Sequence, residues 1–169
     1  MLIGLLLTGV TSLVVQSMQF SAIYKNDMLG GLLAQEGIEL VRFQRDTNRL
    51  QGNNNWLEGL TNPPAPCWPQ ECIAKINPVD GVVTFSRCVG LCANANNGEM
   101  YLWQDTATGI YAHQKGAPGW VQTPFRRLIQ VQDISNGSVK AARVTVTVQW
   151  KGRYGDDEIV VRDILTDWQ

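Results

Sequence analysis

The first 24 residues, MLIGLLLTGVTSLVVQSMQFSAIY, carry no charged side chain, and helical spacing continues from them to about residue 50. A helix of 24 residues is about 36 Å long, whereas the hydrocarbon core of a bilayer is about 30 Å thick. The run is therefore long enough to cross a membrane. It predicts an apolar membrane or filament-core helix over residues 1–25.

Two other interpretations of this run are a removed secretory signal peptide and a buried helix of a soluble domain. A signal peptide requires a basic region before its apolar core, and no basic residue precedes Leu2. No small-residue cleavage site follows the run either. The sequence therefore favours a retained helix.

Residues 26–50 continue the helix in amphipathic form. At 100° per residue, one arc is apolar and the opposite side is polar. The apolar arc contains Leu29, Leu33, Ala34, Gly37, Ile38, Leu40, Val41 and Phe43, and the polar side contains Gln35, Glu39 and Arg42. The segment QGNNN at 51–55 ends the pattern. We therefore expect one helix of about 75 Å across the first 50 residues.

Three residues of this amphipathic half are candidates for contacts in an assembly. Gly30 and Gly31 mark a place where the helix could bend, because each Gly costs a helix about 1 kcal/mol relative to Ala. Glu36 lies within the apolar arc. It either extends to the edge of the arc or binds a cation on a neighbouring chain.

Small residues recur in the apolar half, at Gly4, Thr8 and Ser12. Spacing by four places them on one helix face, which lets two helices approach closely. Chance recurrence in a run that contains Gly and Thr is the alternative explanation.

Four cysteines lie between the helix and the carboxy-terminal region, at 67, 72, 88 and 92. A hairpin that turns at Asp80-Gly81 pairs positions whose numbers sum to about 160. This register predicts nested disulfides, Cys72–Cys88 inside and Cys67–Cys92 outside. A four-thiolate zinc site is the alternative, although CxxxxC and CxxxC are not the tight CxxC pairs typical of zinc.

The region 100–169 has the alternation of strands. Val144, Val146 and Val148 fall on one side of the segment VTVTVQW and the polar residues between them on the other. Short connections predict a four-stranded antiparallel sheet in meander order. Its apolar face matches the apolar arc of the helix. The expected fold class is α+β, with a long N-terminal helix packed on the sheet and the loop 51–99, clipped by disulfides, between them.

Several of these segments resemble a known family. An apolar helix that runs unbroken into LLAQEGIELVR, then a loop and a meander, is similar to type IV pilins and type II secretion pseudopilins. The segment LAQEGIELVR is similar to the same helical stretch in minor pilins. The segments TPFRRLIQV and VTVTVQW and the ending ILTDW also resemble such sheets. The basic leader, the glycine before the cleavage point and the glutamate after it are not found at Met1–Leu7. No residue is therefore assigned the role of that glutamate.

The resemblance implies a structural subunit of a type IV pilus or pseudopilus-like filament, assembled through the apolar helix. The implied partners are copies of itself or sister pilins, the inner-membrane assembly platform, and membrane lipid before assembly. The implied location is the bacterial inner membrane and then a cell-surface filament or a periplasmic pseudopilus.

The alternative function is a membrane-tethered extracytoplasmic binding module that does not polymerise, with Trp120 as the candidate surface contact. An enzyme is not expected: His113 is the only histidine, and we interpret it as a surface residue of a hairpin. No cofactor or metal is expected either, since solvated turn charges explain the acidic run Asp156–Glu158 better than calcium does. The net charge of −1 predicts no nucleic-acid partner.

Overall fold

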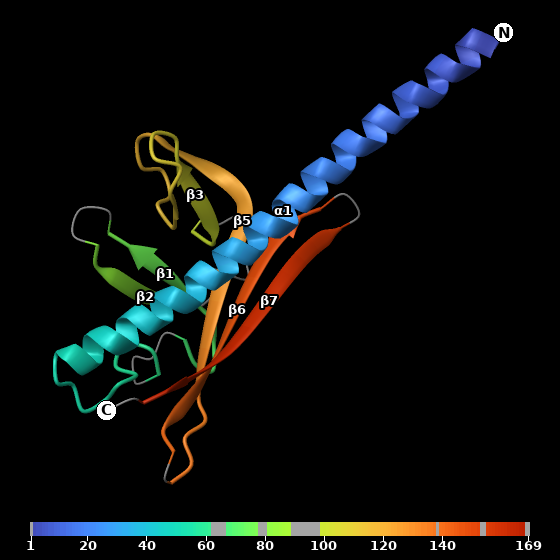
Figure 1. The fold of residues 1–169 in the computed structure, drawn as a ribbon. Helices are drawn as coiled ribbons and strands as arrows, with labels where there is room; N and C mark the ends of the chain where they lie inside the picture. Colours follow the sequence, from blue (N-terminus) through green and yellow to red (C-terminus); the bar gives the residue numbers. More distant parts are fainter. Residues whose placement is uncertain are drawn as a thin grey trace.

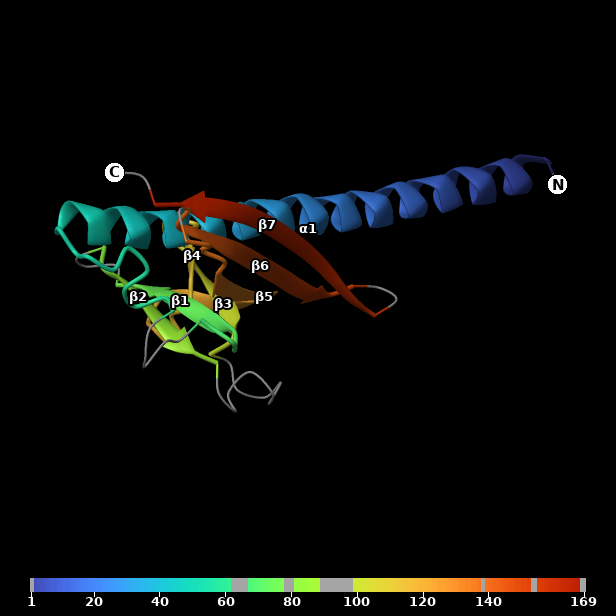
Figure 2. The same ribbon diagram turned by 90° about the horizontal axis from the view of Figure 1, so that it is seen from below.

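One long helix, α1 (Leu2–Leu50), crosses one face of an antiparallel sheet, and its N-terminal half extends beyond the sheet (Figures 1 and 2). This structure is a computed structural model. It describes residues 2–61, 67–77, 81–88, 99–137, 139–152 and 155–167, with the backbone alone for 2–10, 19 and 22. The predicted α+β architecture is confirmed.

The continuity of α1 and its end both follow from the sequence. The helix stays regular through Gly30 and Gly31, so the bend that these residues allow is not present. It ends where Gly52 adopts a φ of 71°. There the N–H of Gly52 donates to the carbonyl of Arg49, and the N–H of Asn53 donates to the carbonyl of Asn48. This pair of bonds is the glycine-dependent cap that satisfies the last helical carbonyls.

Seven strands form one sheet within the described residues. The strands are β1 (Cys72–Ile76), β2 (Val83–Arg87), β3 (Tyr101–Asp105), β4 (Tyr111–Ala112), β5 (Trp120–Asp133), β6 (Ala141–Lys151) and β7 (Asp156–Thr166). Strands β5, β6 and β7 form a meander of long antiparallel pairs. This part of the predicted topology is confirmed.

The predicted count of four strands and the simple meander order are wrong. β3 pairs with β4 and also directly with β5, so the chain does not pass from neighbour to neighbour at that point. The hairpin of β1 and β2 joins the same sheet, where Cys72 lies opposite Ile129 of β5. At 14 residues, β5 is long enough to pair with β3 and β1 along one edge and with β6 along the other. The region 51–99, predicted as a connecting loop with a hairpin, therefore contributes two strands to the sheet.

The core lies between α1 and the inner face of the sheet. Val144, Val146 and Val148 of β6 are buried, as their alternation predicted. They meet the helix residues Leu33, Ala34, Ile38 and Val41, which are also buried. Two glycines set the distance between the layers. A Cβ on Gly30 would lie 2.7 Å from the Trp150 ring, and a Cβ on Gly37 would lie 2.7 Å from Val146 Cγ1.

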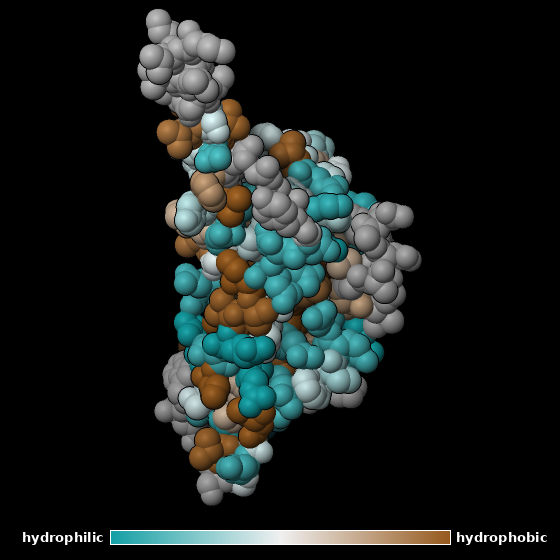
Figure 3. All heavy atoms as spheres, turned by 90° about the vertical axis from the view of Figure 1, so that its right-hand side faces the viewer, coloured by the Kyte–Doolittle hydropathy of each residue, from teal (hydrophilic) through white to brown (hydrophobic). Residues whose placement is uncertain are grey.

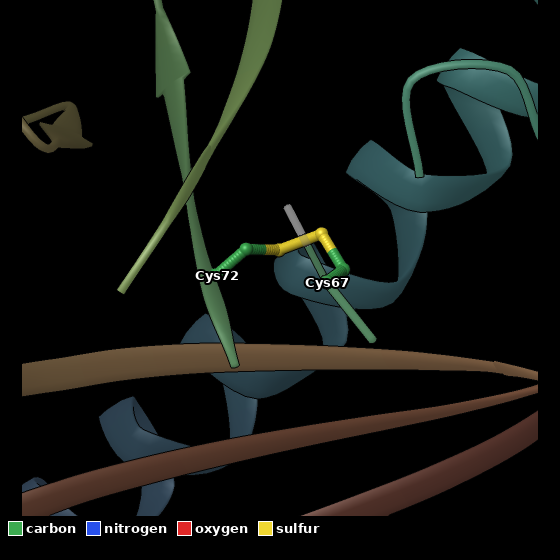
Figure 4. Close-up of a disulfide and its surroundings, with 2 residues drawn as sticks. All are labelled: Cys67 and Cys72. Atoms are coloured by element: carbon green, nitrogen blue, oxygen red, sulfur yellow. A yellow bond between two sulfur atoms is a disulfide. The ribbon is translucent and has the colours of Figure 1, made fainter. Parts of the chain in front are cut away.

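The cysteines pair differently from the prediction. Cys67 bonds to Cys72, five residues away, with their Cα atoms 4.7 Å apart (Figure 4). Both predicted bridges, Cys72–Cys88 and Cys67–Cys92, are therefore wrong. The hairpin itself is confirmed, but Cys72 pairs with Arg87 rather than with Cys88. A shift of one residue turns a side chain to the other face of the sheet. Cys72 accordingly faces the main core, whereas Cys88 packs with Ile73, Met100 and Leu128.

A membrane span was predicted for residues 1–25, of which residues 1–10 lie outside the residues with described side chains. Among the residues that the structure describes, no helix is both long enough and apolar enough to cross a membrane.

Candidate functional site

The part of α1 that extends beyond the sheet presents large apolar side chains to solvent. We call residues 2–24 the arm. Its exposed apolar side chains, where described, are Leu13, Val14, Val15, Met18, Phe20 and Tyr24. The outer face of α1 continues this surface toward the head with Met28 and Leu32. Figure 3 shows such hydrophobic groups along the helix between hydrophilic ones. Soluble monomers rarely expose so much contiguous apolar surface, and such surfaces mark interaction sites.

The structure separates the predicted packing residues. Gly4 and Thr8 lie in α1, outside the residues with described side chains, and Ser12 is exposed on the arm. Gly30 is buried against Trp150 and therefore packs within the chain. A Cβ on Gly31 would meet no atom within 4 Å. Of the two glycines, Gly31 alone is open to a partner.

Glu36 has a partner in its own chain. Arg127 Nη1 of β5 donates to Glu36 Oε2 at 2.8 Å and to the carbonyl of Leu33 at 3.2 Å. The Glu36 side chain is 35% exposed, whereas that of Arg127 is 0% exposed. The hypothesis that Glu36 binds a cation on a neighbouring chain therefore loses its support. Glu36 instead fixes the helix on the sheet.

Arg127 is the residue that the sequence reasoning missed. It lies on the inward face of β5, between the buried residues Phe125 and Ile129. Its Nε and Nη2 atoms are buried and have no hydrogen-bond partner among the described residues. Burial lowers the pKa of Arg127, and the charge of Glu36 opposes that change. The alternation in PFRRLIQV already placed position 127 on the apolar face, which was the available signal.

His113 is buried, so its interpretation as a surface residue of a hairpin is wrong. Its Nδ1 atom lies 3.1 Å from the carbonyl oxygen of Glu99. Because a carbonyl only accepts, Nδ1 carries the hydrogen in this bond. Burial lowers the pKa of His113 to about 3, and the charge of Arg127 adds to the effect. His113 is therefore neutral near pH 7 and supports the structure of the head.

A second ionic contact joins the helix to the edge strand β7. Arg42 donates to Asp163 Oδ2 at 2.7 Å and also pairs with Glu39, one turn earlier in α1. The hydrogen bond to Asp163 is the main cause of a raised pKa of Arg42. These groups line a shallow groove between α1 and β7. With Glu36 and Arg127, they attach the second half of α1 to the sheet at two places.

The remaining candidates are not brought together into a site. Trp120 is half-buried at the start of β5, opposite Asp105 of β3, and a surface contact through it stays a prediction. Asp156, Asp157 and Glu158 belong to β7 rather than to a turn.

In the described part of the chain, no three metal-ligating side chains lie close together. Zinc binding by the four cysteines is wrong, because Cys67 and Cys72 form a disulfide and Cys88 is also disulfide-bonded.

Comparisons with models of protein families, with curated proteins and with solved structures found no match to this chain.

Proposed function

We propose that this protein is a structural subunit of a type IV pilus or pseudopilus-like filament and that it assembles through the arm of α1. The observation that carries the proposal is the arm itself. It is a regular helix without charged residues, and it extends away from the head with its large apolar side chains in solvent. A head that needed only to fold would gain nothing from this surface.

The energy of burial supports assembly through the arm. Burying a large apolar side chain fully contributes about 1.5–3 kcal/mol. Six such side chains of the arm are exposed in the isolated chain. A bundle of neighbouring arms would remove them from water and thereby stabilise a filament. The partners in this proposal are copies of the chain or sister pilins, delivered by an assembly platform in the inner membrane.

The attachment of α1 to the head fits a subunit that carries load. The arm continues without a break into the half of α1 that packs on β6 and β7. That half is held by close contacts at Gly30 and Gly37 and by the ion pairs of Glu36 and Arg42. A force on the arm would therefore reach the sheet through packed side chains rather than through a linker.

The test is electron microscopy of material sheared from cells that produce the chain, with mass spectrometry of the subunit. We expect filaments that contain it. Met18→Glu places a charge on the arm, at a side chain that is 68% exposed. We expect this variant to fold but to form few or no filaments.

Ile164→Glu is the matched control, because Ile164 is 59% exposed but lies on β7 in the head. It should assemble like the unmodified chain. Filaments that form equally well from Met18→Glu, or a complete lack of filaments from the unmodified chain, would refute the proposed function.

A further inference from the structure

A groove lies where the arm meets the head, and the proposed function does not by itself assign it an occupant. Its volume is about 580 Å³. One wall is the outer face of α1, and the other consists of Gln104 of β3 and Tyr111 of β4. The helix contributes Ser21, Tyr24, Lys25, Met28, Leu29 and Leu32. We call this the junction groove.

The junction groove is open and apolar. Met28 is 71% exposed, and Tyr24 and Leu32 are also more than half exposed. These three side chains are spaced by four residues, so they form one stripe along the helix. Lys25 is the one charged residue among those that line the groove, and it is exposed, so its charge stays in solvent. A chain that packs there must therefore bring few or no charges, since a buried unpaired charge is costly.

The groove continues along the arm. A second, largely open strip is formed by α1 alone: it is lined by Leu13, Gln16, Ser17 and Phe20, and it shares Ser21 and Tyr24 with the junction groove. From Leu13 to Leu32 the two strips follow α1 for about 28 Å. The small side chains of Ser17 and Ser21 leave room for another helix to approach. The surface therefore has the length to receive a helix.

The sequence itself contains a helix that fits these requirements. The first 24 residues are uncharged. The next longest uncharged run in the chain is residues 59–70, which has 12 residues. The arm is helical and about 33 Å long between residues 2 and 24. The arm extends beyond the sheet as part of the continuous helix α1, so it does not fold back onto the head of its own chain (Figure 1). The arm of a second copy is the occupant whose charge and length match.

We infer that the junction groove receives the arm of a second copy of this chain, so that the β3–β4 hairpin of the head, and not α1 alone, forms the interface. The inference rests on the proposed function and specifies which surface of the head the neighbouring subunit uses. Tyr111 and Gln104 then contact the neighbouring arm, and Met28 and Leu32 become buried.

Cross-linking tests the inference directly. The structure contains no free cysteine among its described residues, so an introduced thiol can be labelled selectively. Met28→Cys, in the groove, is mixed with Ser17→Cys, on the arm, and filaments of the mixture are treated with a short thiol-specific bifunctional reagent. We expect an adduct between the two variants, identified by mass spectrometry of the joined peptides.

Val139→Cys replaces Met28→Cys in the control mixture, because Val139 is exposed on the head outside the groove. The control should give at least about tenfold less adduct with Ser17→Cys. That ratio corresponds to a preference of about 1.4 kcal/mol for the groove. Filaments that give equal yields for positions 28 and 139, or none for position 28, would overturn the inference and leave the proposed function intact. A lack of filaments from the unmodified chain would overturn both.

A charge in the groove gives a second readout. Met28→Glu should lower filament yield by at least about tenfold, whereas Gln35→Glu, exposed two turns further along α1, should leave it unchanged. Circular dichroism and thermal melting check that both variants fold. Normal filaments from a folded Met28→Glu would refute the proposed groove contact.

Discussion

Gly37 of α1 and Val146 of β6 approach so closely that a Cβ on Gly37 would lie 2.7 Å from Val146 Cγ1. The same Cβ would lie 3.2 Å from Arg127 Cδ. Both neighbours are fully buried, so neither can move away without disturbing the core. This contact fixes the height of the helix above the sheet and leaves space for Arg127 to reach Glu36.

We therefore predict that Gly37→Ala lowers the free energy of unfolding by about 1–3 kcal/mol, the usual cost of forcing an extra carbon into a packed core. Chemical denaturation of the two proteins measures the difference. Gly31→Ala is the matched control, because a Cβ at Gly31 meets no atom within 4 Å. There the better helix propensity of Ala should stabilise the protein by about 0.5–1 kcal/mol. Equal effects at the two positions would contradict the packing described here.

Replacing Glu36 and replacing Arg127 should lower the free energy of unfolding by different amounts. Glu36→Gln leaves the guanidinium of Arg127 buried without a counter-charge, so we expect a loss of about 2 kcal/mol or more. Arg127→Met removes the buried charge and its unpartnered donors together, so it should cost less than Glu36→Gln. Glu39→Gln disturbs an exposed pair and should cost less than about 1 kcal/mol. Urea titrations of the three variants give the order, and a larger loss for Arg127→Met would contradict it.

His113 predicts a dependence of stability on pH. Its pKa is lowered to about 3 in the folded chain, whereas an unperturbed histidine has a pKa of about 6.5. The unfolded state therefore binds more protons between these values. The stability contribution is complete above about pH 6.5 and is lost as the pH falls toward 3.

The slope that His113 contributes is at most about 1.4 kcal/mol per pH unit. His113→Gln should unfold with a shallower dependence on pH between about 6.5 and 3 than the unmodified chain. Subtracting the two stability curves removes the effect of the carboxylates, which both proteins share. Parallel curves for the two proteins over this range would refute the prediction.

The disulfide of Cys67 and Cys72 predicts a modest stabilisation. The bridge closes a short loop with a sequence separation of five, so the chain-entropy relation gives about 2 kcal/mol. The double variant Cys67→Ser/Cys72→Ser should lose about that much in denaturation experiments. Cleavage after Glu71 and after Lys75 under non-reducing conditions leaves Cys72 on the peptide 72–75, apart from Cys67, Cys88 and Cys92. The peptide 72–75 joined to the peptide that contains Cys67 confirms the pairing, and the same peptide joined to one that contains Cys88 would contradict it.

The sequence by itself determined the features that depend on local periodicity. Helical spacing to residue 50 and the glycine at position 52 determine α1 and its cap, because helix hydrogen bonds join residues only four apart. Alternation likewise determined the buried valines of β6, and the Asp-Gly signal determined the hairpin of β1 and β2.

Tertiary structure decided the features that depend on which distant residues meet. The pairing of β3 with β5 and the attachment of the hairpin to β5 join segments that no periodicity relates. The disulfide pairing depended on a difference of one residue in the register between β1 and β2, because that difference turns Cys72 and Cys88 to opposite faces of the sheet. Glu36 and Arg127 are 91 residues apart, and packing alone brings them together. Long-range contacts reflect the balance of burial and charge over the whole molecule, and a local pattern cannot specify that balance.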